Sequence, residues 1–181
     1  MLRLIVPGDE AYDESTSEFV TVGDIILDLE HSLVSVSKWE SKYKKPFLSE
    51  AKKTTEETLD YIKLMVLTSD FPPEVFSRLT PDNLTEVNNY IQDPMTATWF
   101  NEMKKAPKTS ETITSELIYF WLSTFSIPFE PVERWHLNRL LTLVKICSIK
   151  NSKPEKVDKA TAAERRRELN ERRRKEFNTR G

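Results

Sequence analysis

Two histidines and one cysteine are the side chains of this chain with the most chemical versatility. His31 and His136 are the only imidazoles, and neither has a second His, Cys or carboxylate at metal-ligand spacing on its own predicted element. Cys147 lies in the apolar run 140–149, where we expect it to pack as a small buried hydrophobic residue. The sequence therefore predicts neither a zinc site nor a nucleophilic cysteine.

Glu133, Arg134 and His136 form the group closest to an acid–base cluster. The interpretation that we favour is a polar edge on a packed helix, in which His136 bonds to a neighbouring backbone group. The chain has only 3 glycines, which are too few and too scattered for a phosphate-binding loop or a dinucleotide fingerprint. We expect no enzymatic activity, no metal and no cofactor.

Two arginine triplets near the C-terminal end are the most distinctive local feature. Equivalent arginines are 7 residues apart, so both triplets face the same side of a helix. Such a side could follow a phosphate backbone or an acidic groove. The interleaved glutamates and the lack of a nearby stacking aromatic favour a protein partner over nucleic acid. The predicted partner-binding residues are Arg165, Arg166, Arg167, Leu169, Arg172, Arg173, Arg174 and Phe177.

The elements that must position these residues begin with predicted strands. Apolar and other residues alternate over 2–6, which indicates a strand, and Pro7-Gly8 supplies a turn. Residues 18–22 and 25–30 flank Gly23-Asp24, a two-residue sequence suited to a hairpin turn. We therefore predict a hairpin around Gly23-Asp24, with residues 9–18 as an acidic loop.

Apolar spacing becomes helical from Ser32 onward. A capping box of Thr54 and Glu57 opens one helix, and Thr80-Pro81 opens another. Two strongly apolar helices are expected at the heart of the fold, and residues 95–100 are expected to form a short strand or an extended segment. The predicted helices cover residues 32–43, 54–67, 81–92, 110–125 and 131–149, followed by a charged helix over 160–177.

The resulting fold class is mainly α (α+β), with a small N-terminal antiparallel β-hairpin on a helical body and a charged C-terminal helical arm. We predict a globular domain over 1–150, β-rich over 1–31 and helical over 32–150, and a basic helical tail over 151–181. From residue 1 to 149 there are 15 basic and 23 acidic residues, whereas residues 150–181 hold 12 basic and 6 acidic ones. This asymmetry is typical of a tail that meets an acidic partner.

Targeting signals are weak. The apolar stretch 1–7 is much shorter than the hydrophobic region of a signal peptide, and no segment approaches the length of a membrane span. A single cysteine is in keeping with a reducing compartment. We expect a cytoplasmic protein.

Several phrases of the sequence resemble small proteins encoded among the tail genes of tailed bacteriophages, namely tail assembly chaperones and related tail-morphogenesis proteins. The resemblance covers most of the chain and includes no catalytic signature. Its phrases are residues 30–33, 38–40, 45–48, 113–118, 135–141 and 168–173.

The resemblance implies a protein that binds the long helical tape measure protein, keeps it soluble and helps tail subunits assemble around it. It implies a place in the cytoplasm of the infected bacterial host or in the virion tail. A structural component of the tail or baseplate, held in a ring by its arm, is an alternative. A nucleic-acid-binding regulator that uses the basic arm is a further one. A second copy of the chain is also a candidate partner.

Overall fold

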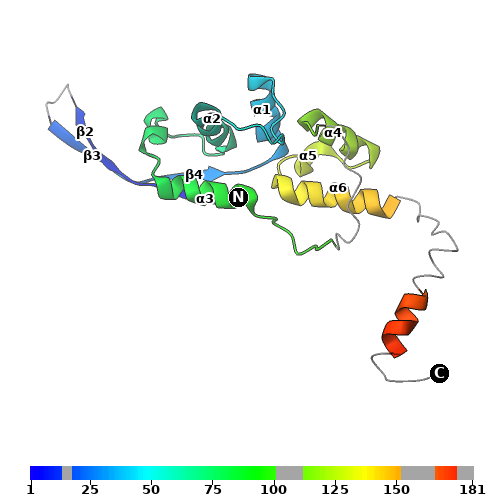
Figure 1. Cartoon of the computed structure of the whole chain (residues 1–181). Helices are drawn as coiled ribbons and strands as arrows, with labels where there is room; N and C mark the ends of the chain where they lie inside the picture. The colour runs from blue at the N-terminus through cyan, green and yellow to red at the C-terminus, as the bar shows by residue number, and fades with distance from the viewer. Residues whose placement is uncertain (14–17, 101–111, 152–165, 175–181) are drawn as a thin grey trace. The chain divides into compact units, whose positions relative to one another are not determined.

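The structure is a computed structural model that describes residues 1–13, 18–100, 112–151 and 166–174. It is mainly helical with a small N-terminal antiparallel β structure, as the sequence predicts (Figure 1). Two units are distinguished, Met1–Cys147 and Ser148–Gly181. In these described segments, no helix has the length and apolar character needed to cross a membrane.

The β structure is a ribbon made of four short strands. β1 (Leu2–Val6) pairs antiparallel with β4 (Ile25–Leu29), and β2 (Asp9–Asp13) pairs antiparallel with β3 (Glu18–Val22). Leu2 lies opposite Leu29 and Asp9 lies opposite Val22, so one register continues through both pairs without a shift. The four strands are therefore the two halves of a single long hairpin, whose distal half in Figure 1 leads away from the helices.

The prediction of a hairpin around Gly23-Asp24 is wrong, although both of its strands exist. β4 pairs with β1, and Gly23-Asp24 lies opposite Pro7-Gly8 at an interruption of the ladder. There the Gly8 N–H donates to the Asp24 carboxylate at 2.8 Å. Proline has no N–H to contribute to a ladder, so the break falls where Pro7 enters it. Part of the predicted acidic loop is instead β2, and residues 14–17 lie outside the described residues.

Pairing of β1 with β4 creates the apolar face on which the helices pack. Leu4, Val6, Leu27 and Leu29 are fully buried on this face. Strand residues two apart share a face, so the four side chains form one patch. A turn at Gly23-Asp24 would pair β4 with β3 and leave β1 unpaired. The observed pairing instead buries the apolar side chains of β1 and β4 together.

Between the ribbon and residue 151, the described residues form seven helical elements: α1 (Leu33–Tyr43), α2 (Thr55–Met65), the 3-10 helix η1 (Pro73–Arg78), α3 (Pro81–Gln92), α4 (Ser115–Thr124), α5 (Phe129–Val132) and α6 (Leu137–Asn151). Hydroxyl side chains cap four of them. The capping residues are Ser32, Thr54, Thr80 and Thr114. The capping box of Thr54 and Glu57 and the start at Thr80-Pro81 are confirmed.

The helical core lies against the ribbon's apolar face. Its largest fully buried side chains on helices include Trp39 and Leu33 of α1, Met65 of α2, Ile118 of α4 and Leu140 of α6. The chain after α2 also adds to the edge of the ribbon, because Leu67 N donates to Asp28 O at 2.8 Å. The body is thus one packed unit of ribbon and helices.

Three expectations about the second half of the body need correction. The helix predicted over 131–149 is two elements, α5 and α6, because residues 133–136 leave the helix and His136 bridges Ser32 in an antiparallel β contact. The helix predicted over 110–125 begins at Ser115, where Thr114 caps it. Of the two forms expected for residues 95–100, a short strand or an extended segment, the strand is absent.

Candidate functional site

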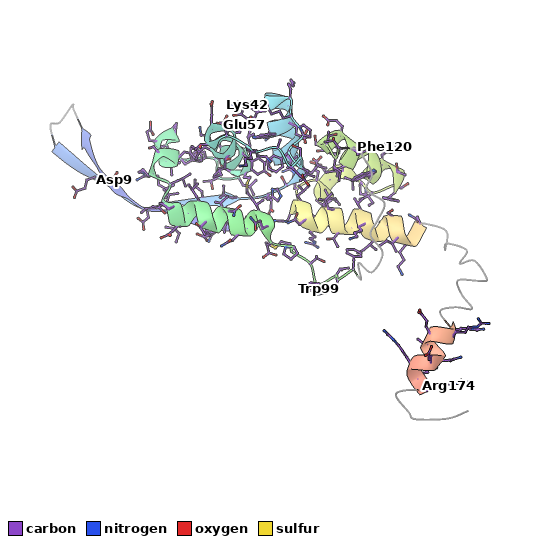
Figure 2. All side chains as sticks on the ribbon, viewed as in Figure 1. Asp9, Lys42, Glu57, Trp99, Phe120 and Arg174 are labelled. Carbon is purple, nitrogen blue, oxygen red and sulfur yellow. The ribbon has the colours of Figure 1, made fainter. Side chains whose placement is uncertain are left out.

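The C-terminal arm is the site that the arginine triplets predict. Residues 166–174 are helical, and all nine side chains are exposed (Figure 2). Of the predicted partner-binding residues, Arg166, Arg167, Leu169, Arg172, Arg173 and Arg174 lie on this helix. Arg165 and Phe177 lie outside the described residues. We call residues 166–174 the arm helix.

One flank of the arm helix carries arginine and leucine without glutamate. At about 100° per residue, Arg166, Leu169 and Arg173 fall within about 60° of one another. Glu168 and Glu171 fall on the opposite side. Arg167, Arg172 and Arg174 fall on the same side as these glutamates, so acidic and basic side chains remain interleaved there. The flank with Arg166, Leu169 and Arg173 holds no glutamate among the described arm residues, and Leu169 on it is 52% exposed.

The two histidines come together in the body, although 104 residues separate them in the sequence. Their ring centroids are 5.0 Å apart in an edge-to-face arrangement. His31 is 2% exposed and His136 is 6% exposed. Leu137 N also donates to His31 O at 2.7 Å, so the segments before α1 and before α6 are bonded side by side.

Each histidine has protein partners that fix a neutral ring. His136 Nδ1 accepts from Asn138 N at 3.3 Å, so Nε2 carries the proton and donates to Tyr90 O at 2.9 Å. His31 Nδ1 forms a hydrogen bond with the Tyr61 hydroxyl at 2.5 Å. Burial lowers the pKa of His31 to about 3 and also lowers the pKa of His136, while burial raises the pKa of Tyr61. This arrangement fastens helices together.

The sequence cluster of Glu133, Arg134 and His136 is dispersed by the fold. Glu133 accepts from the Tyr119 hydroxyl at 3.0 Å, Arg134 pairs with Glu130 at 3.4 Å, and His136 faces the interior. Among the described residues, no group of three His, Cys, Asp or Glu side chains could hold a metal ion. Cys147 is partly buried and has a free thiol.

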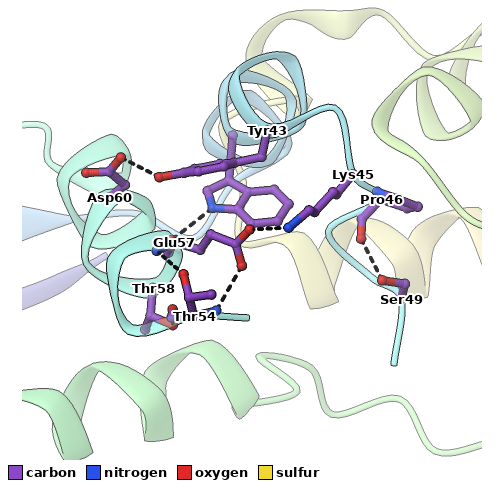
Figure 3. Close-up of polar contacts among 9 residues, drawn as sticks. Tyr43, Lys45, Pro46, Ser49, Thr54, Glu57, Thr58 and Asp60 are labelled. Carbon is purple, nitrogen blue, oxygen red and sulfur yellow. Dashed lines mark hydrogen bonds and ion pairs between the residues drawn. The ribbon is translucent and has the colours of Figure 1, made fainter. Parts of the chain in front are cut away.

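A polar cluster joins α1 to α2 (Figure 3). Trp39 Nε1 donates to Glu57 O at 2.9 Å, and Lys45 pairs with the Glu57 carboxylate at 2.6 Å. Asp60 accepts from Lys42 and Tyr43, and these bonds lower the pKa of Asp60 to about 2. Both acidic groups of the cluster, Glu57 and Asp60, therefore have partners within the protein. The role of the cluster is to hold α1 and α2 together.

An exposed aromatic surface lies on α4 and α5, and the sequence did not predict it. Phe120 is 63% exposed and Phe129 is 45% exposed. Ser123 is one turn from Phe120 on α4, and it lines a shallow hollow of about 380 Å³ together with Ser126, Ile127, Pro128 and Phe129. We call Phe120 and these five lining residues the α4–α5 surface.

The hydrophobic pattern of α4 does not predict this exposed surface. The apolar residues of α4 occur around most of the helix, so hydrophobicity alone predicts burial on every side. In the structure only Ser115, Ile118 and Leu122 of α4 are buried, and Phe120 points away from them (Figure 2). Predicting which side of α4 stays exposed requires knowing how many elements pack around it. A single sequence does not give that number.

Comparisons of this chain with known protein families, with curated proteins and with solved structures gave no match.

Proposed function

We propose that the protein is a non-catalytic assembly protein that binds an apolar helical partner on its α4–α5 surface. In the setting to which the sequence phrases point, the partner is a phage tape measure protein, and the protein is its chaperone during tail morphogenesis. The observation that carries the proposal is the exposure of two phenylalanines: Phe129 lines the hollow, and Phe120 is one helical turn from Ser123, which also lines it.

Exposure of a single apolar side chain is ordinary in a folded protein, whereas a contiguous aromatic patch is typical of an interaction site. A hollow lined by Phe129, with the exposed Phe120 one helical turn from its lining residue Ser123, can accept the apolar face of an amphipathic helix, whose large side chains recur at three- and four-residue intervals. A tape measure protein is long, helical and sparingly soluble by itself, so covering its apolar face is the task that such a surface fits.

The location of the resemblance also supports this setting. Residues 113–118 lead into α4, and residues 135–141 lead into α6. The first phrase adjoins the α4–α5 surface, and the second contains His136, which contacts His31. Two of the six phrases therefore lie in or next to the part of the chain to which we assign the binding role.

The proposal is tested by co-expressing the protein with the tape measure protein of the same phage and measuring how much of the latter stays soluble. The wild-type chain should keep it in the soluble fraction, and the variant Phe120→Ser/Phe129→Ser should lose most of that effect. The matched control is Leu67→Ser/Leu84→Ser, since those leucines are also exposed, at 60% and 39%, but lie on other elements. Equal behaviour of the two variants would contradict the proposal.

A structural role in the tail or baseplate is the second candidate, and the ribbon favours it. β2 and β3 pair only with each other among the described strands, so each keeps one edge on which a neighbouring subunit could add a strand. Mass spectrometry of purified virions separates the two candidates. Stoichiometric presence would support the structural role, and absence would support the chaperone role.

A further inference from the structure

We propose that the arm helix of one copy binds an acidic strip on α3 of a second copy. We define the acidic strip as Asp82, Glu86 and Asp93 together with the exposed Met95 and Trp99. This inference concerns self-association, so it goes beyond the proposed client-binding function and does not depend on it.

The acidic strip is a surface of one charge. Asp82, Glu86 and Asp93 are exposed, and residues 79–100 contain no lysine or arginine. The three acidic positions fall within about 40° of one another around the axis of α3. No ion pair within the described residues involves any of the three carboxylates. The negative charge of this flank is therefore available to a partner.

Apolar side chains extend the strip beyond the end of α3. Met95 is 37% exposed, and Trp99 is 92% exposed, the highest value among the large apolar side chains of the described residues (Figure 2). A tryptophan face in solvent contributes nothing to the folding of the body, but it is the preferred platform for a guanidinium group. The strip therefore suits a basic partner that also carries an apolar side chain.

The arm helix has both features in the required arrangement. Arg166 and Arg173 are 7 residues apart, and so are Glu86 and Asp93. Seven helical residues span about 10.5 Å, so the two arginines and the two carboxylates have the same separation. Both ion pairs can thus form at once, with Leu169 between them and a further arginine free to stack on Trp99.

The occupant is a second copy because the two parts of the chain have complementary charges: residues 150–181 hold 12 basic and 6 acidic residues, whereas residues 1–149 hold 15 basic and 23 acidic ones. The arm is basic and the body acidic, so the attraction joins unlike parts of two identical chains. Such a contact is heterologous, because one copy contributes its arm helix and the other contributes its acidic strip. Repetition of a heterologous contact gives a closed ring or an open filament.

The test is charge reversal in the full chain, read by light scattering coupled to size exclusion at low salt. Wild type should associate, and about 0.5 M salt should return it to the mass of one chain, because exposed ion pairs are screened. Arg166→Glu/Arg173→Glu and Glu86→Lys/Asp93→Lys should each abolish association. Combining the four substitutions in one chain should restore it. Circular dichroism of each variant checks that the body remains folded.

The matched control is Glu50→Lys/Glu56→Lys, which makes the same change of net charge at exposed positions away from the strip and should associate as wild type does. A wild type that stays monomeric at low salt, or a four-fold variant that fails to reassociate, would overturn the inference. If the wild type and all variants are monomeric at low salt, the arm does not bind a second copy, and the body of its own chain becomes the candidate partner. The variant Phe120→Ser/Phe129→Ser should still associate, which separates failure of this inference from failure of the proposed function.

Discussion

The two histidines occupy the point where the ribbon, α1, α2, α3 and α6 meet. His31 contacts Tyr61 of α2, and His136 bonds to the backbone of Tyr90 in α3. Tyr90 in turn donates from its hydroxyl to Glu30 at 2.6 Å, which returns the network to the end of β4. Each ring thus connects elements that are remote in the sequence, and each must remain neutral to do so.

Stability should therefore fall as the pH drops below about 6.5, the ordinary pKa of histidine. The folded state holds both histidine pKa values below that of the unfolded chain, so the unfolded state binds more protons as the pH decreases toward about 3. Protonation of His31 in the unfolded chain should alone reduce the free energy of unfolding by about 2 kcal/mol between pH 7 and pH 5. Asp60 titrates below this window, because its pKa is near 2.

Urea unfolding at the two pH values measures this effect. His31→Gln should flatten most of the dependence, whatever its effect on stability at pH 7. A free energy of unfolding that is the same at pH 7 and pH 5 in the wild-type protein would show that the histidines are not held neutral by the fold.

Individual side chains were predictable where the signal is local. The caps at Thr54 and Thr80 follow from neighbours in the sequence, and His136 accepts from the backbone N–H of nearby Asn138. The contact between His31 and His136 was not predictable, because it depends on which elements pack together. The exposure of Phe120 and Trp99 was missed for the same reason.

At the scale of elements, most helices and strands were predicted, and the errors lie in how they pair. Gly23-Asp24 has the residue types of a turn, but β4 pairs with β1, and Leu4, Val6, Leu27 and Leu29 are then buried on one face. Residues 133–136 have helical propensity, but their backbone bonds to the segment before α1. Long-range pairing overrode local propensity in both cases.

Glu40 shows how one residue holds three elements in place. Its carboxylate is buried near the end of α1 and accepts from Phe47 N and from Ser115 N, each at 2.7 Å. Ser115 is the first residue of α4, where backbone N–H groups lack partners within the helix. A negative charge there also interacts favourably with the helix dipole.

We expect Glu40→Ala to lower the free energy of unfolding by about 3 kcal/mol, because two buried N–H donors would lose a charged acceptor. Glu40→Gln retains one acceptor oxygen and should cost less. Lys38→Ala is the control, since Lys38 is exposed on the same helix and its loss should change stability by less than about 0.5 kcal/mol. Denaturant unfolding of the three variants ranks them. Equal stability of Glu40→Ala and Lys38→Ala would refute the role of Glu40.

At the scale of the whole molecule, charge is divided between two units that differ in construction. The unit Met1–Cys147 contains the ribbon and the buried core, whereas Ser148–Gly181 carries the arm helix. The sequence predicts this division through its composition, since apolar residues become rare after residue 149. The acidic strip was not predicted, because its members share a flank only once α3 is formed.

Removing the arm should leave the body folded. No described side chain of the arm helix is buried, and its helix has Leu169 as the only large apolar residue, so the core gains little from it. Truncation after Asn151 should therefore shift the melting temperature by no more than a few degrees, because about 1 kcal/mol corresponds to about 2 to 4 °C in a domain of this size. Association at low salt should be lost at the same time.

Leu169→Ser in the full chain separates the apolar contribution from the charge: it should weaken association without changing the melting temperature. A truncated chain that unfolds or aggregates, beside a Leu169→Ser variant that associates normally, would place the segment in the core.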